Sequence, residues 1–309
     1  MPLVGKKVQG NIMLLITAII WGSAFVAQRT GMQYIGPFTF NGIRSFIGAL
    51  VLIPVILIFS KISKNKDEQL SEKVRENLNQ QKGELRTLII GGICCGTILF
   101  ISSSLQQIGL QYTSAGKAGF ITALYIVLVP IAGRLVHKKV RPILWFCVII
   151  ALIGLYLLTI KEGFKIEKGD FVIFLCALGF TAHIMVIDHF SPKVNGVKLS
   201  CIQFFVCGVL SVPAMLLTET VDLQAVLDCW VPICYAGILS CGVAYTLQII
   251  AQKHTDPTIA SLLMSLESVF ALIAGWIVLG EQLSPKELIG CLIMFIAIII
   301  SQLPEKKKE

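Results

Sequence analysis

Length, composition and charge exclude an ordinary soluble protein. The chain has 309 residues, of which 55% are hydrophobic and only 14% are charged, and its mean hydropathy is +0.81. A soluble domain carries about 25% charged residues, so this chain has too few to cover its surface in water. The net charge of +8 comes from Lys and Arg placed in loops between apolar segments, which predicts a lipid bilayer and no nucleic acid as partner.

Ten apolar segments follow one another along the chain, and each is close to the roughly 20 residues that cross a bilayer as a helix. The first five predicted spans are 12–28, 38–59, 86–107, 115–136 and 142–160. The other five are 170–189, 197–218, 229–250, 257–279 and 285–303. The first segment resembles a signal peptide, but nine further spans favour an uncleaved helix. The polar stretch 61–83 is predicted as the one substantial loop, either a short surface helix or disordered.

The positive charges predict how the chain is oriented. An even number of spans puts both termini on one side, and that side carries 19 of the 26 Lys and Arg residues. The opposite side carries 5, and Arg44 and Lys117 lie at membrane depth. Because positive loops stay in the cytoplasm, we expect both termini there, in a cytoplasmic membrane, most naturally a bacterial one.

Ten cysteines lie almost entirely within the apolar segments. They lack the CxxC or Cys/His spacing of a metal site, so they are interpreted as small packing residues. The sequence therefore predicts neither a metal nor a cofactor.

The chain contains an internal repeat. Shifting it by 142 residues aligns Leu105–Val136 with Leu247–Val278 without a gap and with eleven identical positions, including Gln106 with Gln248 and Thr113 with Thr255. After one inserted residue, Pro142 lies opposite Pro285. We therefore divide the chain into repeats 1–165 and 166–309 with five spans each. An odd number of spans makes the two copies enter the membrane from opposite sides, which is typical of secondary transporters with a binding site between the repeats.

Several short motifs, in this order and spacing, closely resemble the EamA-type branch of the drug/metabolite transporter superfamily. They are Trp21-Gly22-Ser23, Arg44, Thr113-Ser114-Ala115-Gly116, Leu266-Glu267-Ser268-Val269-Phe270 and Leu279-Gly280-Glu281. The resemblance covers nearly the whole chain in two copies. It implies an all-α integral membrane protein with ten transmembrane helices, arranged as two inverted five-helix repeats around a cavity. It also implies export of amino acids, other small metabolites or toxic compounds. Ser268 stands where the family often has Pro, so a straighter ninth helix is expected.

Two basic residues at membrane depth are candidates for substrate binding, because a charge within the bilayer is costly. Lys117, near the outer end of the fourth span with Tyr125 two turns later, would favour a substrate with a carboxylate or phosphate. Its alternative role is to reach the outer headgroups with its amine. Arg44 lies early in the second span and either contacts a substrate anion, closes a gate through an ion pair, or forms a purely structural ion pair.

Two further titratable residues lie within predicted spans. Glu267, near the middle of the ninth span, is a candidate for proton coupling or a helix-packing residue whose charge is neutralised or paired. His183 in the sixth span is a candidate cavity-lining residue, although a single membrane histidine more often bonds a neighbouring helix. Aromatic and amide side chains complete the candidates: Trp21, Tyr125, Gln106, Gln107, Gln203, Tyr245 and Gln248.

These features predict a secondary transporter that is not an enzyme. No HExxH motif is present, and Ser102, Ser103 and Ser104 have no placed histidine, which disfavours a membrane enzyme. A channel would show a filter or pore-lining rings. We expect export of amino acids or other small metabolites by alternating access, with protons as candidate coupling ions and either a monomer or a homodimer. Efflux of cationic compounds, which would prefer Glu267, is the alternative.

Overall fold

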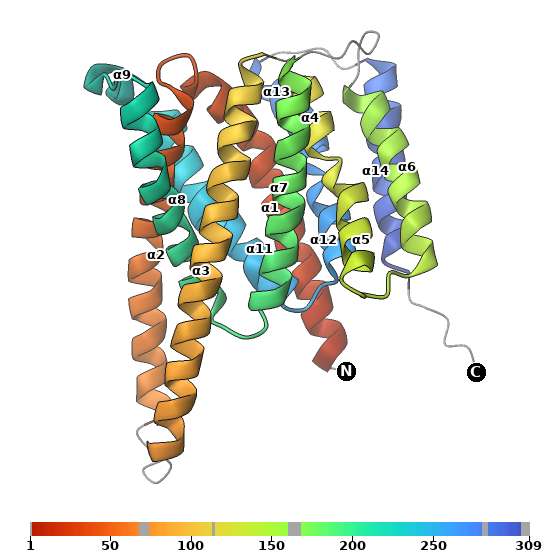
Figure 1. The fold of residues 1–309 in the computed structure, drawn as a ribbon. Helices are drawn as coiled ribbons and strands as arrows, with labels where there is room; N and C mark the ends of the chain where they lie inside the picture. The colour runs from red at the N-terminus through yellow and green to blue at the C-terminus, as the bar shows by residue number, and fades with distance from the viewer. Residues whose placement is uncertain (1, 68–73, 113–114, 160–167, 280–283, 304–309) are drawn as a thin grey trace, which may run out of the picture.

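The structure is a computed structural model that describes residues 2–67, 74–112, 115–159, 168–279 and 284–303 (Figure 1). All regular structure in these ranges is helical. Eight described segments are long and apolar enough to cross a membrane, which confirms the predicted all-helical membrane class. Of the family-like motifs, Thr113, Ser114, Gly280 and Glu281 lie outside the described residues.

The helices in the first half of the chain are α1 (Pro2–Gly31), α2 (Pro37–Asp67), α3 (Val74–Leu110), α4 (Ala115–Thr122), α5 (Tyr125–Leu135) and α6 (Pro142–Thr159). Those in the second half are α7 (Lys168–Phe190), α8 (Gly196–Thr218), α9 (Leu223–Asp228), α10 (Trp230–Cys234), the π-helix η1 (Tyr235–Ala244), α11 (Tyr245–Gln252), α12 (Pro257–Met264), α13 (Glu267–Leu279) and α14 (Pro285–Ser301). Every predicted span falls on one or more of these helices. The spans predicted at 142–160 and 285–303 correspond to α6 and α14, which are not among the eight longest apolar segments.

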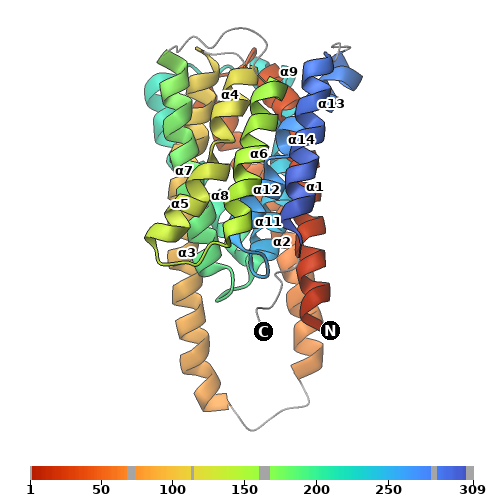
Figure 2. The same ribbon diagram turned by 90° about the vertical axis from the view of Figure 1, so that its right-hand side faces the viewer.

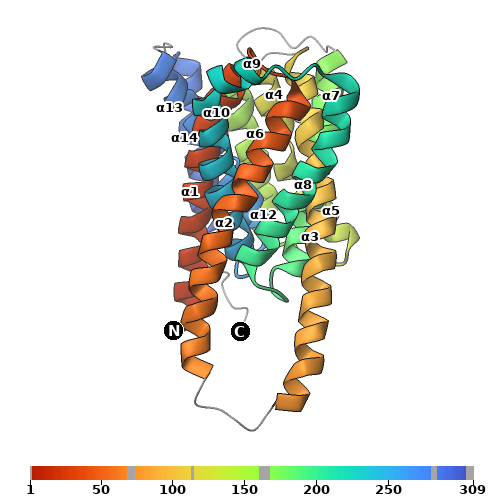
Figure 3. The same cartoon turned by 90° about the vertical axis from the view of Figure 1, so that its left-hand side faces the viewer.

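Residues 61–67 and 74–83 of the hydrophilic stretch are helical, which agrees with the helical alternative, although they extend α2 and α3 and do not form a separate short helix. Helix α2 continues to Asp67 and α3 begins at Val74, so both project beyond the rest of the bundle (Figures 2 and 3). The reason is that Lys, Glu and Gln are unsuited to a bilayer but have high helix propensity, so the helices can extend into water. Residues 68–73 lie outside the described part.

Local chemistry explains where several helices begin. Proline, which lacks the N–H that a first turn cannot use, is the first residue of α2, α6, α12 and α14. Asn195 accepts hydrogen bonds from Val197 N and Lys198 N at the start of α8, and Asp256 accepts one from Thr258 N at the start of α12. Such capping satisfies backbone donors that the helix itself leaves free.

The long helices pack in pairs, and glycines allow their backbones to approach closely. Helix α2 lies along α8, α3 lies along α7 and α8, and α1 lies against α13 and the segment from α10 to α11. Helix α6 lies along α14, where a Cβ on Gly154 would be 2.8 Å from Gly290 O. Close contact between small residues is a principal source of helix association in membranes.

Two segments are interrupted at equivalent places. The chain breaks helical structure at 123–124, between α4 and α5, and at 265–266, between α12 and α13. These breaks lie 142 residues apart, the spacing of the sequence repeat. Figure 1 shows α4 above α5 but α13 above α12, so the two broken segments run in opposite directions. The ninth predicted span is therefore interrupted even though Ser268 is not a proline.

The beginning of α1 and the end of α14 lie at the same end of the bundle (Figure 1). Asn11 Nδ2 donates a hydrogen bond of 2.6 Å to Gln302 Oε1, which joins the two regions directly.

Candidate functional site

A pocket lies within the bundle. Its wall combines aromatic and apolar side chains with a small number of polar ones, which is the usual make-up of a small-molecule site. The lining residues are Trp21, Phe25, Gln28, Arg44, Gln106, Thr122, Tyr125, Phe180, His183, Ile184, Ser240, Tyr245, Gln248, Met264 and Glu267.

The two interrupted segments bring a phenol and a carboxyl group together at the pocket. Tyr125 is the first residue of α5 and Glu267 the first residue of α13, and Tyr125 Oη donates a hydrogen bond of 3.0 Å to Glu267 Oε1. Both side chains are buried, with exposed fractions of 3% and 6%. The pair is separated by 142 residues in the sequence, so the contact joins the same position of the two repeated segments.

Two more pairs of lining residues have this separation of 142. They are Gln106 with Gln248 and Thr122 with Met264. The repeat found in the sequence therefore contributes matching positions to one shared pocket.

Arg44 provides a guanidinium to the pocket wall. Its Nε and Nη2 donate to Asn41 Oδ1 at 3.2 and 3.0 Å, and the guanidinium carbon lies 5.6 Å from the centre of the Phe40 ring. Asn41 and Phe40 are on the same helix, so they orient Arg44 without neutralising its charge. The guanidinium has five donors, which leaves others for a bound anion.

A cluster of aromatic rings forms another part of the pocket wall. The ring of Tyr245 lies 4.5 Å from that of Trp21 and 5.9 Å from that of His183, measured between centroids. His183 is 1% exposed, and its Nε2 lies 3.1 Å from Gln203 Oε1. This bond between α7 and α8 matches the helix-bonding alternative for His183, although the residue also lines the pocket.

The amide candidates divide between the pocket and helix contacts. Gln107 Nε2 donates to Gln28 Oε1 at 2.6 Å, and Gln248 Nε2 donates to Gln252 Oε1 at 3.0 Å. Among the described residues, Gln248 Oε1 and Trp21 Nε1 are buried without a hydrogen-bond partner, and both residues line the pocket. One acceptor and one donor are thus left for a ligand.

Lys117 lies in α4, but its side chain is outside the described part of the structure, so its role stays a prediction. Among the residues that sequence reasoning did not select, Thr122 and Phe180 line the pocket. The repeat spacing could have identified Thr122, because it aligns with Met264 beside the family-like motif. Phe180 carries no distinguishing signal within an apolar helix.

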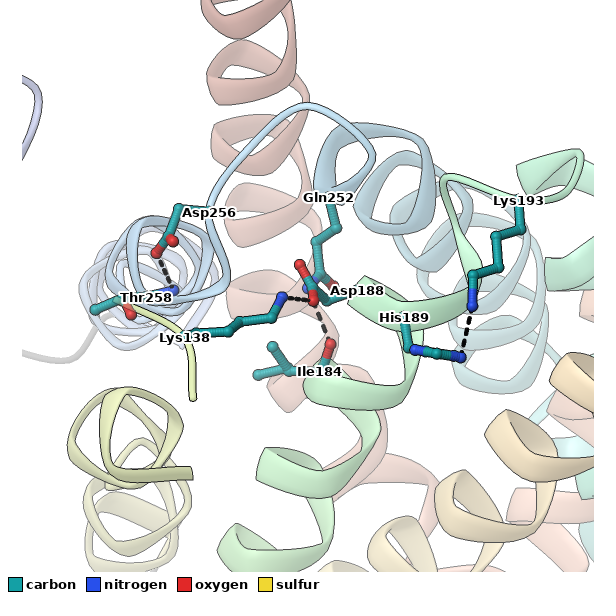
Figure 4. Close-up of polar contacts among 8 residues, drawn as sticks. All are labelled: Lys138, Ile184, Asp188, His189, Lys193, Gln252, Asp256 and Thr258. Carbon is teal, nitrogen blue, oxygen red and sulfur yellow. Dashed lines mark hydrogen bonds and ion pairs between the residues drawn. The ribbon is translucent and has the colours of Figure 1, made fainter. Parts of the chain in front are cut away.

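The end of the bundle that holds both termini is joined by polar contacts (Figure 4). Lys138, in the connection between α5 and α6, forms an ion pair with Asp188 of α7, and Gln252 Nε2 donates to Ile184 O at 3.1 Å. Lys193, which follows α7, instead contacts His189 in the last turn of the same helix. No group of His, Cys, Asp or Glu in the described residues is arranged to hold a metal.

One protein family matches nearly the whole chain. The sequence model described as the EamA-like transporter family matches residues 8–160 and 167–303. A protein of Archaeoglobus fulgidus named "Uncharacterized transporter" is 32% identical over 96% of this chain and 87% of its own length. The "Uncharacterized transporter YoaV" of Bacillus subtilis is 23% identical over 93% of this chain and 94% of its own.

A solved crystal structure also resembles the whole chain. It aligns with a TM-score of 0.75, covering 95% of this chain and 98% of its own, at 16% sequence identity. At that identity the likeness concerns the fold alone.

Proposed function

Because the chain belongs to the EamA-like transporter family, we propose that it exports amino acids or other small zwitterionic metabolites by alternating access from the central pocket. The observation that carries this proposal is the composition of the pocket wall. It offers Arg44 to a carboxylate and Glu267 to an ammonium group, between aromatic and apolar side chains that suit a hydrophobic substituent.

Alternating access would use two repeats of opposite orientation, 1–165 and 166–309, with five spans in each. The opposite directions of the segments α4–α5 and α12–α13 support this arrangement (Figure 1). The two ranges matched by the family, 8–160 and 167–303, support the same division. In such a plan the halves rock around a central site, often at interrupted helices.

Glu267 is our proposed proton-coupling residue. A carboxyl group can bind and release a proton, and this one lies in the pocket wall with the Tyr125 phenol as its partner. A proton and a substrate ammonium would compete for it, which is a simple physical basis for exchange of one against the other.

The orientation proposed from charge has both termini in the cytoplasm of a cytoplasmic membrane. The contact between Asn11 and Gln302 supports termini on one side. Labelling intact cells with a membrane-impermeant maleimide should modify a cysteine placed at Tyr34 and not one at Lys193.

The proposed oligomeric state is either a monomer or a homodimer. The mass of the detergent-solubilised protein distinguishes the two.

Efflux of cationic compounds is the second candidate. Glu267 lies in the same wall as Trp21 and Tyr245, and aromatic faces attract organic cations. Such a substrate would have no use for Arg44.

Counterflow in proteoliposomes tests both candidates. Vesicles loaded with unlabelled L-leucine should accumulate radiolabelled L-leucine with saturation. Arg44→Gln should raise the leucine concentration needed for half-saturation, whereas Lys193→Gln, a change at the exposed end of the bundle, should leave it unchanged. Counterflow of radiolabelled tetraphenylphosphonium that leucine does not inhibit would favour the cationic alternative. Ionic current without exchange would overturn both.

A further inference from the structure

The π-helix η1 is the feature that distinguishes one side of the pocket from the other. It spans ten residues between α10 and α11, and Tyr245 N bonds to Ser240 O five residues back instead of four. A π turn therefore contains one residue more than an α turn. Such wide turns are rare and occur frequently at functional sites.

Glycine contacts near the start of η1 show which residue of α3 is equivalent to Gly237 of η1. A Cβ on Gly96 would lie 2.6 Å from Gln203 O and 2.7 Å from Val206 Cβ. A Cβ on Gly237 would lie 3.1 Å from Arg44 O and 2.7 Å from Ile47 Cβ. Gln203 and Val206 follow Arg44 and Ile47 by the same 159 residues, so Gly96 and Gly237 occupy equivalent places at a separation of 141.

Contacts beyond the end of η1, in α11, give a different sequence separation between equivalent residues. A Cβ on Gly169 would lie 3.0 Å from Gly109 O, and a Cβ on Gly10 would lie 3.3 Å from Ala251 O. Gly169 follows Gly10 by the same 159 residues, so Gly109 and Ala251 are equivalent, at a separation of 142. The segment containing η1 thus holds one more residue between Gly237 and Ala251 than α3 holds between Gly96 and Gly109.

We propose that η1 absorbs a one-residue insertion relative to α3, and that the wide turn so formed determines the substrate specificity of the pocket. The second part rests on the proposed transport function and deepens it. In an α-helix one extra residue would rotate everything beyond it by about 100°. The wide turn accommodates the residue locally, so both flanking helices keep their packed faces.

The wide turn also supplies side chains that α3 does not. Ser240 and Tyr245, at the two ends of the hydrogen bond that marks the π turn, both line the pocket, whereas Gln106 is the one described residue of α3 that does. Tyr245 then meets the Trp21 ring at 4.5 Å. The two halves of the pocket therefore differ at η1, and a substrate with one polar and one apolar end needs such a difference.

Helix α1 holds both ends of η1. Ser23 Oγ and Tyr235 Oη share a hydrogen bond of 2.6 Å, and Thr17 Oγ1 donates to Ala244 O at 3.0 Å. Since Trp21 lies on α1 between Thr17 and Ser23, these bonds fix the wide turn against the aromatic part of the pocket.

Single-residue deletions test the insertion. Deleting Leu239 or Val243, each 37% exposed, should convert η1 to an α-helix and leave a monodisperse protein whose Tm falls by only a few degrees. Deleting Ile101, which is 49% exposed in the uninterrupted α3, should shift the register of that helix and prevent folding. If both η1 deletions fail as completely as the α3 deletion, the insertion is refuted.

Ligand binding by the folded deletion variants tests specificity. Calorimetric titration with L-leucine, L-phenylalanine, L-glutamate and tetraphenylphosphonium should give a changed order of affinities, with at least one Kd altered about tenfold, equivalent to 1.4 kcal/mol. An unchanged order would refute the specificity role. If no probe binds the wild-type protein, the proposed function and the specificity role fail together, while the folding comparison still decides the insertion.

Discussion

Glu267 and Tyr125 each begin a half-helix, and their hydrogen bond connects α13 with α5. A movement of one half of the bundle against the other must change this contact. Because its carboxyl group can exchange protons, Glu267 is the member of this pair that is suited to relate proton binding to movement.

Replacing Glu267 with Gln should separate coupling from transport. Glutamine keeps the size and an acceptor for Tyr125 but cannot release a proton, so uptake driven by a pH gradient should be lost. Exchange of substrate for substrate should persist, at a lower affinity because the charge that attracts the substrate ammonium is gone. Proteoliposome assays with and without a gradient measure both. The control is Tyr125→Phe, which removes the bond but not the carboxyl and should retain gradient-driven uptake. Gradient-driven uptake equal to wild type in the Gln variant would exclude Glu267 as the coupling group.

Arg44→Gln should weaken binding of carboxylate ligands selectively. A hydrogen bond to a charged group contributes about 1.5–3 kcal/mol, so the Kd for L-leucine should rise roughly 10- to 100-fold. Leucinol, which lacks the carboxylate, should bind both proteins equally in calorimetric titrations. Equal losses for the two ligands would instead assign Arg44 a structural role with Asn41 and Phe40.

At the scale of helices, the apolar segments were predictable and their interruptions were not. The breaks are Ala-Leu at 123–124 and Ser-Leu at 265–266, within segments that are apolar on average, and neither contains glycine or proline. Hydropathy reports burial in lipid and is indifferent to a turn within it. Similarly, the periodicity of the sequence did not predict η1. The extra residue becomes visible only when the contacts of Gly96 with α8 are compared with those of Gly237 with α2.

The contact between α6 and α14 should be sensitive to a single methyl group. In Gly154→Ala the new Cβ would lie 2.8 Å from Gly290 O, so the helices must separate, and overpacking of this kind costs about 1–3 kcal/mol. Thermal unfolding in detergent should show a lower Tm. Gly119→Ala is the matched control, because a Cβ there meets nothing within 4 Å and alanine favours a helix. An equal Tm for both variants would contradict close packing of α6 on α14.

At the scale of the whole molecule, the end that holds the termini is closed by contacts between separate elements. Lys138 and Asp188 join the α5–α6 connection to α7, and Gln252 joins α11 to the same helix (Figure 4). In the alternating-access mechanism that we propose, opening toward this end requires these contacts to break.

Lys138→Ala should therefore increase amide hydrogen exchange near the end of α7, at residues 184–190. The Lys138 and Asp188 side chains are 40% and 13% exposed, and pairs of this kind contribute about 0.2–1 kcal/mol, so the expected increase is at most about fivefold. The swapped variant K138D/D188K should return exchange toward the wild-type rate. Lys193→Ala removes only a contact with His189 at the end of the same helix, so it should leave exchange at residues 184–188 unchanged. No increase in K138A would show that the pair does not hold this end closed.

The sequence by itself determined the membrane class, the family, the position of every apolar segment and the internal spacing of 142 residues. These are properties of local hydropathy, helix-starting residues and internal similarity, which do not depend on how helices meet. It also selected Arg44, Glu267, Tyr125 and Tyr245 as candidates, because polar groups at membrane depth are costly. Their functional roles stay predictions.

The tertiary structure alone decided which of those groups meet. That Tyr125 faces Glu267, that Arg44 is oriented by Asn41, and that His183 bonds Gln203 follow from the relative rotation and depth of helices. Those quantities depend on contacts between segments far apart in the chain, such as the close approach of Gly96 in α3 to Gln203 in α8. Apolar sequence specifies that a helix lies in lipid, whereas packing specifies which of its residues reach the pocket.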